Sequence, residues 1–160
     1  MNVAIVDDEL EMRQTLVDYI GRFGEESGIE LETVTFESGE QFLKNYKLIF
    51  NIIIFDIDMP GINGIDTARK LREMDSNVTI IFVTNIAQYA INGYEVDAVD
   101  YILKPVSYYD FSMKFHRTVA KAAQKKEHTI KIETAEGTRR LRLPALIYVA
   151  IHKINIIACM

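Results

Sequence analysis

Five short apolar runs, separated by segments of helical character, occupy about the first 125 of the 160 residues. The runs are rich in Val, Ile and Phe and are apolar on both sides, as expected of parallel strands that are covered on both faces. They are Val3–Val6, Leu31–Phe36, Ile52–Phe55, Thr79–Val83 and Val99–Leu103. Strands that alternate with helices predict a doubly wound parallel sheet, because each crossover helix packs back onto the sheet.

The helical segments carry signals of their own. Two of them begin with a capping pattern, Asp8 with Glu11 and Ser38 with Gln41. The segment Gly64–Met74 has apolar residues at helical spacing, and a longer helix is expected from after Ser107 to about Lys126. Five such units suit an α/β sheet with the flavodoxin-like strand order 2-1-3-4-5, in which ligands bind beyond the carboxyl ends of the strands.

Reactive side chains follow four of the five predicted strands. They are Asp7 and Asp8 after the first, Asp56 after the third, Thr84 after the fourth and Lys104 after the fifth. Because the carboxyl ends of parallel strands lie at one edge of the sheet, this order gathers three carboxylates, a hydroxyl and an ammonium in one crevice.

These groups suit phosphoryl transfer to a carboxylate. Acids that lie close together repel one another and require a cation, and Mg²⁺ binds carboxylates, waters and phosphate oxygens. We expect Asp56 to be the nucleophile, since carboxylates form acyl phosphates, and the backbone carbonyl of Asp58 to complete the metal shell. Lys104 would meet one phosphate oxygen with its charge, and Thr84 another with its hydroxyl.

The same residues lie in motifs that closely resemble the receiver domain of response regulators. The motifs are Val3-Ala-Ile-Val-Asp-Asp-Glu9, Ile54-Phe-Asp-Ile-Asp-Met-Pro-Gly61, Asn63-Gly64, Phe82-Val-Thr84 and Asp100-Tyr-Ile-Leu-Lys-Pro105. The resemblance implies that Asp56 is phosphorylated by a histidine kinase. It also implies the remaining site residues: Asp7, Asp8, Asp56 and the Asp58 carbonyl for Mg²⁺, Thr84 and Lys104 for phosphate, and Tyr101 as an aromatic switch that moves with Thr84.

The resemblance further implies a two-state switch. The segment before Val99, the strand Val99–Leu103 and the last helix would form a face that changes on phosphorylation and mediates homodimerisation. Residues expected on or near that face are Tyr94, Asp97, Tyr108 and Tyr109. The Lys104–Pro105 bond is cis in this family. Asn85 departs from the family's pattern, which mostly has a small residue there.

Residues 127–160 differ in character from residues 1–126, which we interpret as the receiver domain. Expected strands are Thr129–Thr134, Arg140–Leu143, Leu146–Val149 and Ile154–Ala158, the first two joined by a hairpin-like turn. The stretch from Thr129 to Tyr148 resembles the opening strands of the LytTR-type DNA-binding domain. It implies a transcription regulator with an incomplete DNA-binding domain here, in which His152 and Lys153 are candidates for DNA contact.

The charge is unevenly distributed along the chain. Residues 1–110 carry 8 Lys and Arg against 20 Asp and Glu, whereas residues 111–160 carry 10 against 3. The basic part would be attracted to a phosphate backbone, although a basic last helix that balances an acidic domain explains the pattern equally well. One cysteine, no long apolar run and an acidic N-terminus indicate a cytoplasmic protein with no membrane segment.

Two other functions fit parts of the pattern. The triplet Asp56-Ile-Asp58 also resembles the D-x-D motif of haloacid-dehalogenase-type phosphatases. There, however, the motif lies on the first strand and continues into Gly-Thr, whereas here it follows the third strand and continues into Met-Pro-Gly. A stand-alone receiver whose tail serves only as an interaction strand is the other alternative. We expect a phosphorylation switch rather than a turnover enzyme.

Overall fold

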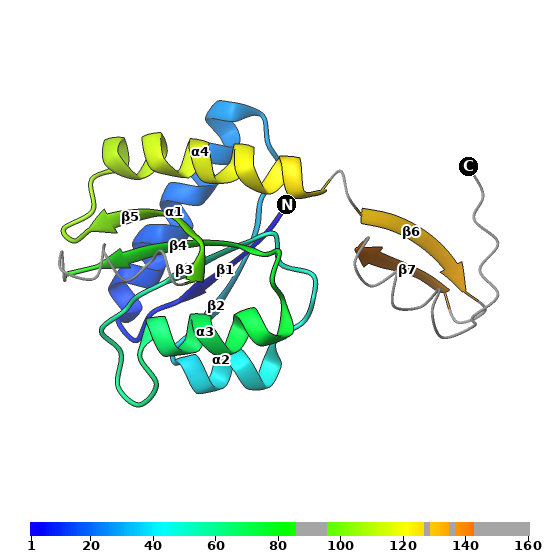
Figure 1. Ribbon diagram of the computed structural model, residues 1–160. Coiled ribbons are helices and arrows are strands. Elements are labelled where there is room, and N and C mark those ends of the chain that lie inside the picture. Colours follow the sequence, from blue (N-terminus) through cyan, green and yellow to red (C-terminus); the bar gives the residue numbers. More distant parts are fainter. Residues whose placement is uncertain (86–95, 127–128, 135–136, 143–160) are drawn as a thin grey trace. The chain divides into compact units, whose positions relative to one another are not determined.

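The computed structural model describes residues 1–85, 96–126, 129–134 and 137–142. Contacts divide the chain into two units, Met1–Ala122 and Ala123–Met160. The first unit holds a five-stranded parallel sheet in the order β2-β1-β3-β4-β5 (Figure 1), which confirms the predicted flavodoxin-like α/β fold. The strands are β1 (Asn2–Val6), β2 (Glu32–Phe36), β3 (Ile52–Phe55), β4 (Thr79–Thr84) and β5 (Ala98–Leu103). The helices are α1 (Leu10–Ser27), α2 (Gly39–Asn45), α3 (Gly64–Met74) and α4 (Tyr108–Lys126).

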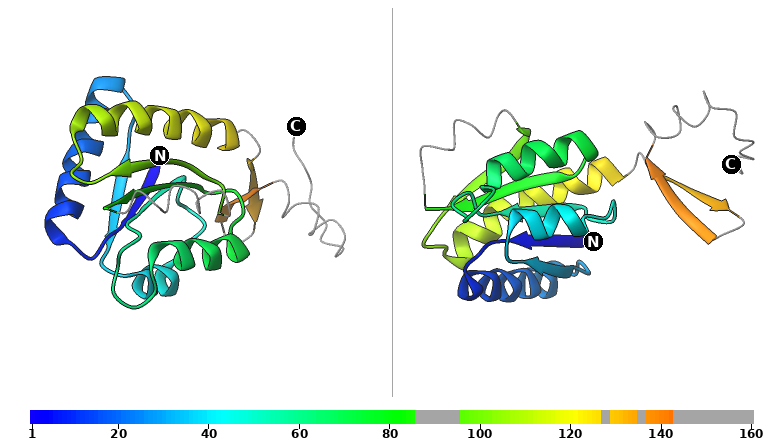
Figure 2. Two further views of the ribbon diagram at one scale, coloured as in Figure 1. Left: turned by 60° about the vertical axis from the view of Figure 1, so that its left-hand side comes forward. Right: turned by 90° about the horizontal axis from the view of Figure 1, so that it is seen from below.

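Helices cover the sheet on both faces, with α2 and α3 on one side and α1 and α4 on the other (Figures 1 and 2). The burial of β3 on both faces explains why its sequence is apolar throughout. Ile53 and Phe55 pack with α2 and α3, while Ile52 and Ile54 pack with α1 and α4. The edge strand β2 differs from our expectation of two-sided burial, because it has one strand neighbour and leaves Val34 44% exposed.

The helix boundaries test the two predicted capping patterns. Ser38 does cap α2, since its hydroxyl accepts the Gln41 N–H at 3.1 Å. The expectation for Asp8 is wrong: α1 has Glu9 at its N-cap, with no side-chain capping hydrogen bond. Asp8 lies one residue too early, and its carboxylate is clustered with other acids instead. Helix α1 ends at Ser27 and is followed by Gly28, whose φ of +67° is the left-handed conformation that favours glycine.

The second unit contains an antiparallel hairpin of β6 (Thr129–Thr134) and β7 (Gly137–Arg142). Thr129 pairs with Arg142 and Thr134 with Gly137, so β7 begins earlier than the expected strand Arg140–Leu143. The strands expected at Leu146–Val149 and Ile154–Ala158, like His152 and Lys153, lie outside the described residues. None of the helices in the described ranges is long and apolar enough to cross a membrane.

Candidate functional site

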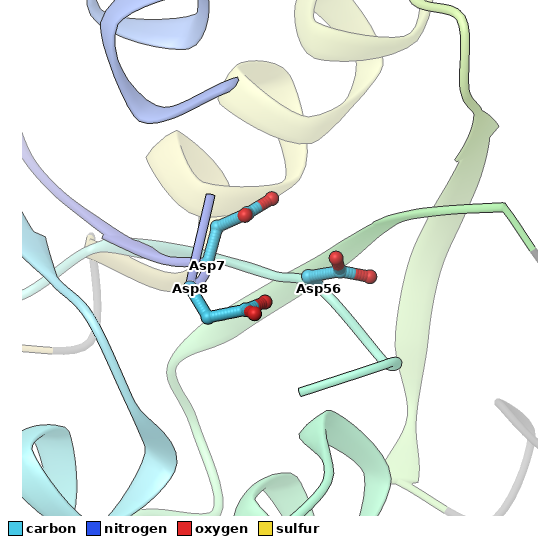
Figure 3. Close-up of side chains that lie close together, drawn as sticks. All are labelled: Asp7, Asp8 and Asp56. Carbon is cyan, nitrogen blue, oxygen red and sulfur yellow. The ribbon is translucent and has the colours of Figure 1, made fainter. Parts of the chain in front are cut away.

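Three aspartates meet where β1 and β3 leave the sheet. The two strands are neighbours in register, Val6 beside Phe55, and the Asp56 N–H continues the pairing by donating to the Val6 carbonyl at 2.8 Å. Carboxylate oxygens of Asp7, Asp8 and Asp56 all lie within 4.8 Å of one another (Figure 3). The predicted strand order therefore does bring these acids together.

Lys104, at the end of β5, supplies the positive charge. Its Nζ lies 2.6 Å from Asp56 Oδ2, 2.9 Å from Glu9 Oε1 and 3.1 Å from Asp7 Oδ2. The Lys104 side chain is only 5% exposed, and those of Asp7 and Asp56 are 1% exposed. These charges interact with little solvent between them, so their mutual attraction is weakly screened.

Burial and charge act in opposite directions on these groups. Burial favours the neutral amine, but the hydrogen bonds to Asp56 and Glu9 outweigh it and hold the pKa of Lys104 above its ordinary value. For Asp7 burial is the largest influence, and it raises the pKa of that carboxyl despite the Glu9 N–H and the nearby Lys104. Asp7 Oδ2 has an ion contact with Lys104 but, among the described residues, no directional hydrogen bond.

The loop between β3 and α3 is held against the Asp56 backbone. The Asp58 N–H donates to Asp56 Oδ1 at 3.1 Å, and the Gly64 N–H donates to the Ile57 carbonyl at 3.0 Å. A Cβ on Gly64 would lie 1.9 Å from the Asp56 carbonyl oxygen, so only glycine permits this approach. Asn63 caps α3 by accepting the Asp66 N–H at 2.8 Å. This close packing fixes where the backbone of Asp58 passes the site.

The two residues expected to act as a switch lie on β4 and β5. Thr84 is fully buried at the end of β4, and its carbonyl accepts the Lys104 N–H at 3.0 Å. The Tyr101 ring stacks on Phe82 with centroids 5.1 Å apart. Its hydroxyl is buried without a partner among the described residues, and burial raises the pKa of Tyr101 to about 12.

The other residues expected on or near a switching face differ from one another in their surroundings. Tyr109 is 69% exposed, and Asp97 forms a 3.5 Å ion pair with Lys121 of α4. Tyr108 instead turns toward α1, where its hydroxyl donates to Glu26 at 2.6 Å and its ring faces the Arg22 guanidinium. Tyr94 lies outside the described residues, whereas Asn85 is described and exposed. The Lys104–Pro105 bond is cis, as the resemblance implies.

Among the described acids that contact Lys104, Glu9 is the one to which sequence reasoning assigned no role. It follows directly on Asp7 and Asp8, and its carboxylate contacts Lys104, as those of Asp7 and Asp56 do. Its place beside two candidate metal ligands was the available signal. A glutamate at the start of a helix is ordinary, however, so nothing in the sequence distinguished it from a helix-terminal acid.

The donor set fits a hard divalent cation. Three carboxylates from two adjacent strand ends offer oxygen ligands, and the buried Asp7 Oδ2 has no directional hydrogen bond from the described residues. Mg²⁺ prefers oxygen ligands and is usually bound through one or two carboxylates plus water and phosphate oxygens. An acidic cluster beside a buried lysine, at the carboxyl ends of a flavodoxin-like sheet, defines a receiver-type domain.

The chain belongs to the response regulator receiver domain family, whose model matches residues 3–115. The sensory transduction protein LytT of Oceanobacillus iheyensis is 34% identical over 136 residues, which are 83% of this chain and 54% of that protein. The transcriptional regulatory protein LytR of Staphylococcus aureus is 37% identical over 106 residues, 66% of this chain and 42% of that protein. The chain thus spans about half the length of these relatives. The sensory transduction protein LytR of Staphylococcus saprophyticus matches 98% of this chain and 64% of its own length at 29% identity.

Solved structures show the same likeness. The response regulatory domain of mrkE from Klebsiella pneumoniae has a TM-score of 0.66 at 27% identity, covering 78% of this chain and 99% of that chain. The response regulator TrrA of Thermotoga maritima, solved in complex with Mg²⁺-BeF, has a TM-score of 0.62 at 28% identity, covering 73% and 97%. The chain is therefore a signalling protein with a receiver domain, similar to LytT- and LytR-type regulators.

Proposed function

We propose that Asp56 accepts a phosphoryl group from the phosphohistidine of a histidine kinase. The P–N bond of the donor breaks, a P–O bond forms to the Asp56 carboxylate, and the histidine nitrogen keeps the electron pair. The observation that supports this is the placement of Asp56 in one cluster with two further acids and with Lys104 Nζ at 2.6 Å. Such a carboxylate lies among candidate ligands for a cation and is in contact with a positive charge.

The residues that would hold Mg²⁺ are Asp7, Asp8, Asp56 and the backbone carbonyl of Asp58. The bound ion supplies positive charge that offsets the acids and the phosphoryl oxygens. Lys104 provides the second positive charge, already in contact with Asp56, and Thr84 provides a hydroxyl donor at the neighbouring strand end. Both act on charge that is carried by the transferred group, as phosphoryl transfer requires.

Thr84 and Tyr101 then form the switch. Thr84 is drawn toward the phosphoryl oxygens, and the Tyr101 ring follows. Tyr101 is suited to move because its hydroxyl has no partner among the described residues to lose, and the ring is only partly buried. The phosphoryl group biases a two-state equilibrium through this pair and so alters the surface near β5 and α4.

The switch controls transcription through DNA binding, and the protein forms a homodimer on phosphorylation. Support comes from the relative named as a transcriptional regulatory protein, and from the sensory transduction protein LytR that aligns with 98% of the chain. The chain would then consist of a receiver domain at 1–126 and the opening part of a DNA-binding domain at 127–160. A cytoplasmic location, beside the kinase, belongs to the same proposal.

The test is phosphorylation of the full chain by a small acyl phosphate with Mg²⁺. Intact-mass measurement should show the gain of one phosphoryl group in the wild type and in Asp18→Asn, an exposed acid on α1, but none in Asp56→Asn or with EDTA. Undiminished phosphorylation of Asp56→Asn would exclude Asp56 as the acceptor. Continuous hydrolysis of phosphomonoesters, without a stable phosphorylated protein, would favour a phosphatase instead.

A further inference from the structure

Lys104 is shared with a fourth carboxylate that the proposed function does not use. Its ammonium donates to Asp56 Oδ2 at 2.6 Å and to Glu9 Oε1 at 2.9 Å, and it also contacts Asp7. An ammonium group has three N–H donors. Two of them donate to Asp56 and Glu9, and Asp7 Oδ2 lies 3.1 Å away, so a phosphoryl oxygen competes with three carboxylates for the ammonium.

Glu9 is the contact that is released most readily. The Glu9 side chain is 54% exposed, whereas those of Asp7 and Asp56 are 1% exposed. An exposed carboxylate regains its water when an ion pair breaks, so such pairs contribute little net stability. A buried carboxylate that loses its cation is left uncompensated, which is far more costly. The contact that Lys104 gives up to a phosphoryl oxygen is therefore the one with Glu9.

The Glu9 side chain has no other structural duty among the described residues. Glu9 is the N-cap residue of α1, but its carboxylate caps no N–H group of the helix. Only the backbone of Glu9 takes part in the helix start: its carbonyl accepts the Arg13 N–H at 3.1 Å, and its N–H donates to Asp7 Oδ1 at 2.8 Å. The carboxylate is directed to Lys104 instead, across 95 positions of sequence.

We propose that Glu9 is a releasable anchor for Lys104, a positioning residue that holds the ammonium beside Asp56 and gives it up to an incoming phosphoryl group. This rests on the proposed function, because it requires a phosphoryl group on Asp56. The Glu9 contact stabilises the site around the unmodified carboxylate and competes with the phosphoryl oxygens afterwards. Removing Glu9 therefore favours the phosphoryl-bound site. It also removes one negative charge beside the aspartates, which weakens their attraction for a divalent cation.

The test compares the wild type, Glu9→Ala and Glu11→Ala by calorimetric titration of the full chain. Glu11 is an exposed acid in the first turn of the same helix, so its removal matches the charge change without touching Lys104. With saturating Mg²⁺, beryllium fluoride serves as the phosphoryl probe. We expect Glu9→Ala to bind it about two- to fivefold more tightly, the range of an exposed ion pair. Glu9→Ala should bind Mg²⁺ alone about twofold more weakly, and Glu11→Ala should match the wild type in both titrations.

Opposite changes for the two ligands distinguish this role from a structural one, since damage to the site would weaken both. Unchanged or weaker beryllium fluoride binding by Glu9→Ala would overturn the proposal, and so would an equal gain in Glu11→Ala. If the wild type binds Mg²⁺ but no beryllium fluoride and cannot be phosphorylated, the proposed function itself fails. The two failures are therefore separable.

Discussion

Replacing Lys104 by Met should destabilise the receiver domain, because two buried aspartates lose the cation that compensates their charge. Met keeps most of the buried stem, so packing changes little, but the positive charge is lost. Asp7 and Asp56, each with a side chain only 1% exposed, then lack the ammonium that lies 3.1 Å and 2.6 Å from them. Removing one partner of a buried ion pair costs about 3–5 kcal/mol. We expect a loss near the lower limit, about 3 kcal/mol, because Asp8 and Glu9 are exposed and admit water.

The measurement is urea unfolding at pH 7 with EDTA, with Lys70→Met, an exposed lysine on α3, as the control. Adding Mg²⁺ should restore much of the loss, because a cation at about one hundred times its Kd contributes roughly 2.7 kcal/mol. The increment should be larger in Lys104→Met than in the wild type, where Lys104 competes for the same carboxylate oxygens.

The pH dependence gives a second check with a defined sign. The pKa of Asp7 is already raised above 3.8 in the folded protein, and loss of Lys104 raises it further. A carboxyl with a raised pKa destabilises the fold above that pKa and ceases to do so once it is protonated. The deficit of Lys104→Met should therefore shrink as the pH falls through the folded-state pKa of Asp7. Equal urea midpoints for Lys104→Met and Lys70→Met in EDTA at pH 7 would refute the reasoning.

Two further substitutions test the same site, and a third, on α1, serves as a control. Asp7→Asn should stabilise the protein at pH 7 by about 1 kcal/mol while weakening Mg²⁺ binding, because it removes a buried charge whose pKa is raised by burial. In urea titrations this gain should vanish as the pH falls below the folded-state pKa of Asp7, and a pH-independent gain would contradict the assigned cause. Gly64→Ala should cost about 3 kcal/mol or more, since its Cβ would lie 1.9 Å from the Asp56 carbonyl oxygen. Gly21→Ala, with nothing within 4 Å of its added Cβ, should instead stabilise α1 by about 1 kcal/mol. Thermal unfolding of both variants measures this contrast, which equal destabilisation would disprove.

The fold was predictable because strands that are buried on both faces have sequences that are apolar throughout. Ile52–Phe55 is apolar throughout since both faces of β3 are covered, and the predicted bounds are those of the structure. The same reasoning was wrong for β2, where the apolar run predicted cover on both faces but Val34 is 44% exposed. A strand's own residues do not reveal whether it lies at the edge of the sheet; for β2 the edge position followed from the predicted strand order, which the structure confirms.

The cluster of acids was predictable for a related reason. Where a strand ends is a property of the backbone, and adjacent parallel strands deliver their last residues to the same place. Asp7, Asp8 and Asp56 needed no knowledge of rotamers to be grouped. The capping pattern of Asp8 with Glu11 failed because spacing alone does not show that the helix starts one residue later, at Leu10.

The direction of the Glu9 side chain depends on a competition that spacing cannot express. A carboxylate at a helix N-terminus gains about 0.3–1 kcal/mol from the helix dipole. The ion pair with Lys104, whose Nζ lies 2.9 Å from Glu9 Oε1, contributes a similar amount, because the Glu9 side chain is 54% exposed. Two interactions of similar size cannot be ranked from the sequence, and Lys104 is brought near Glu9 only by the fold. The small free energy of the Glu9 contact also means that a phosphoryl oxygen can replace it, as a releasable anchor for Lys104 requires.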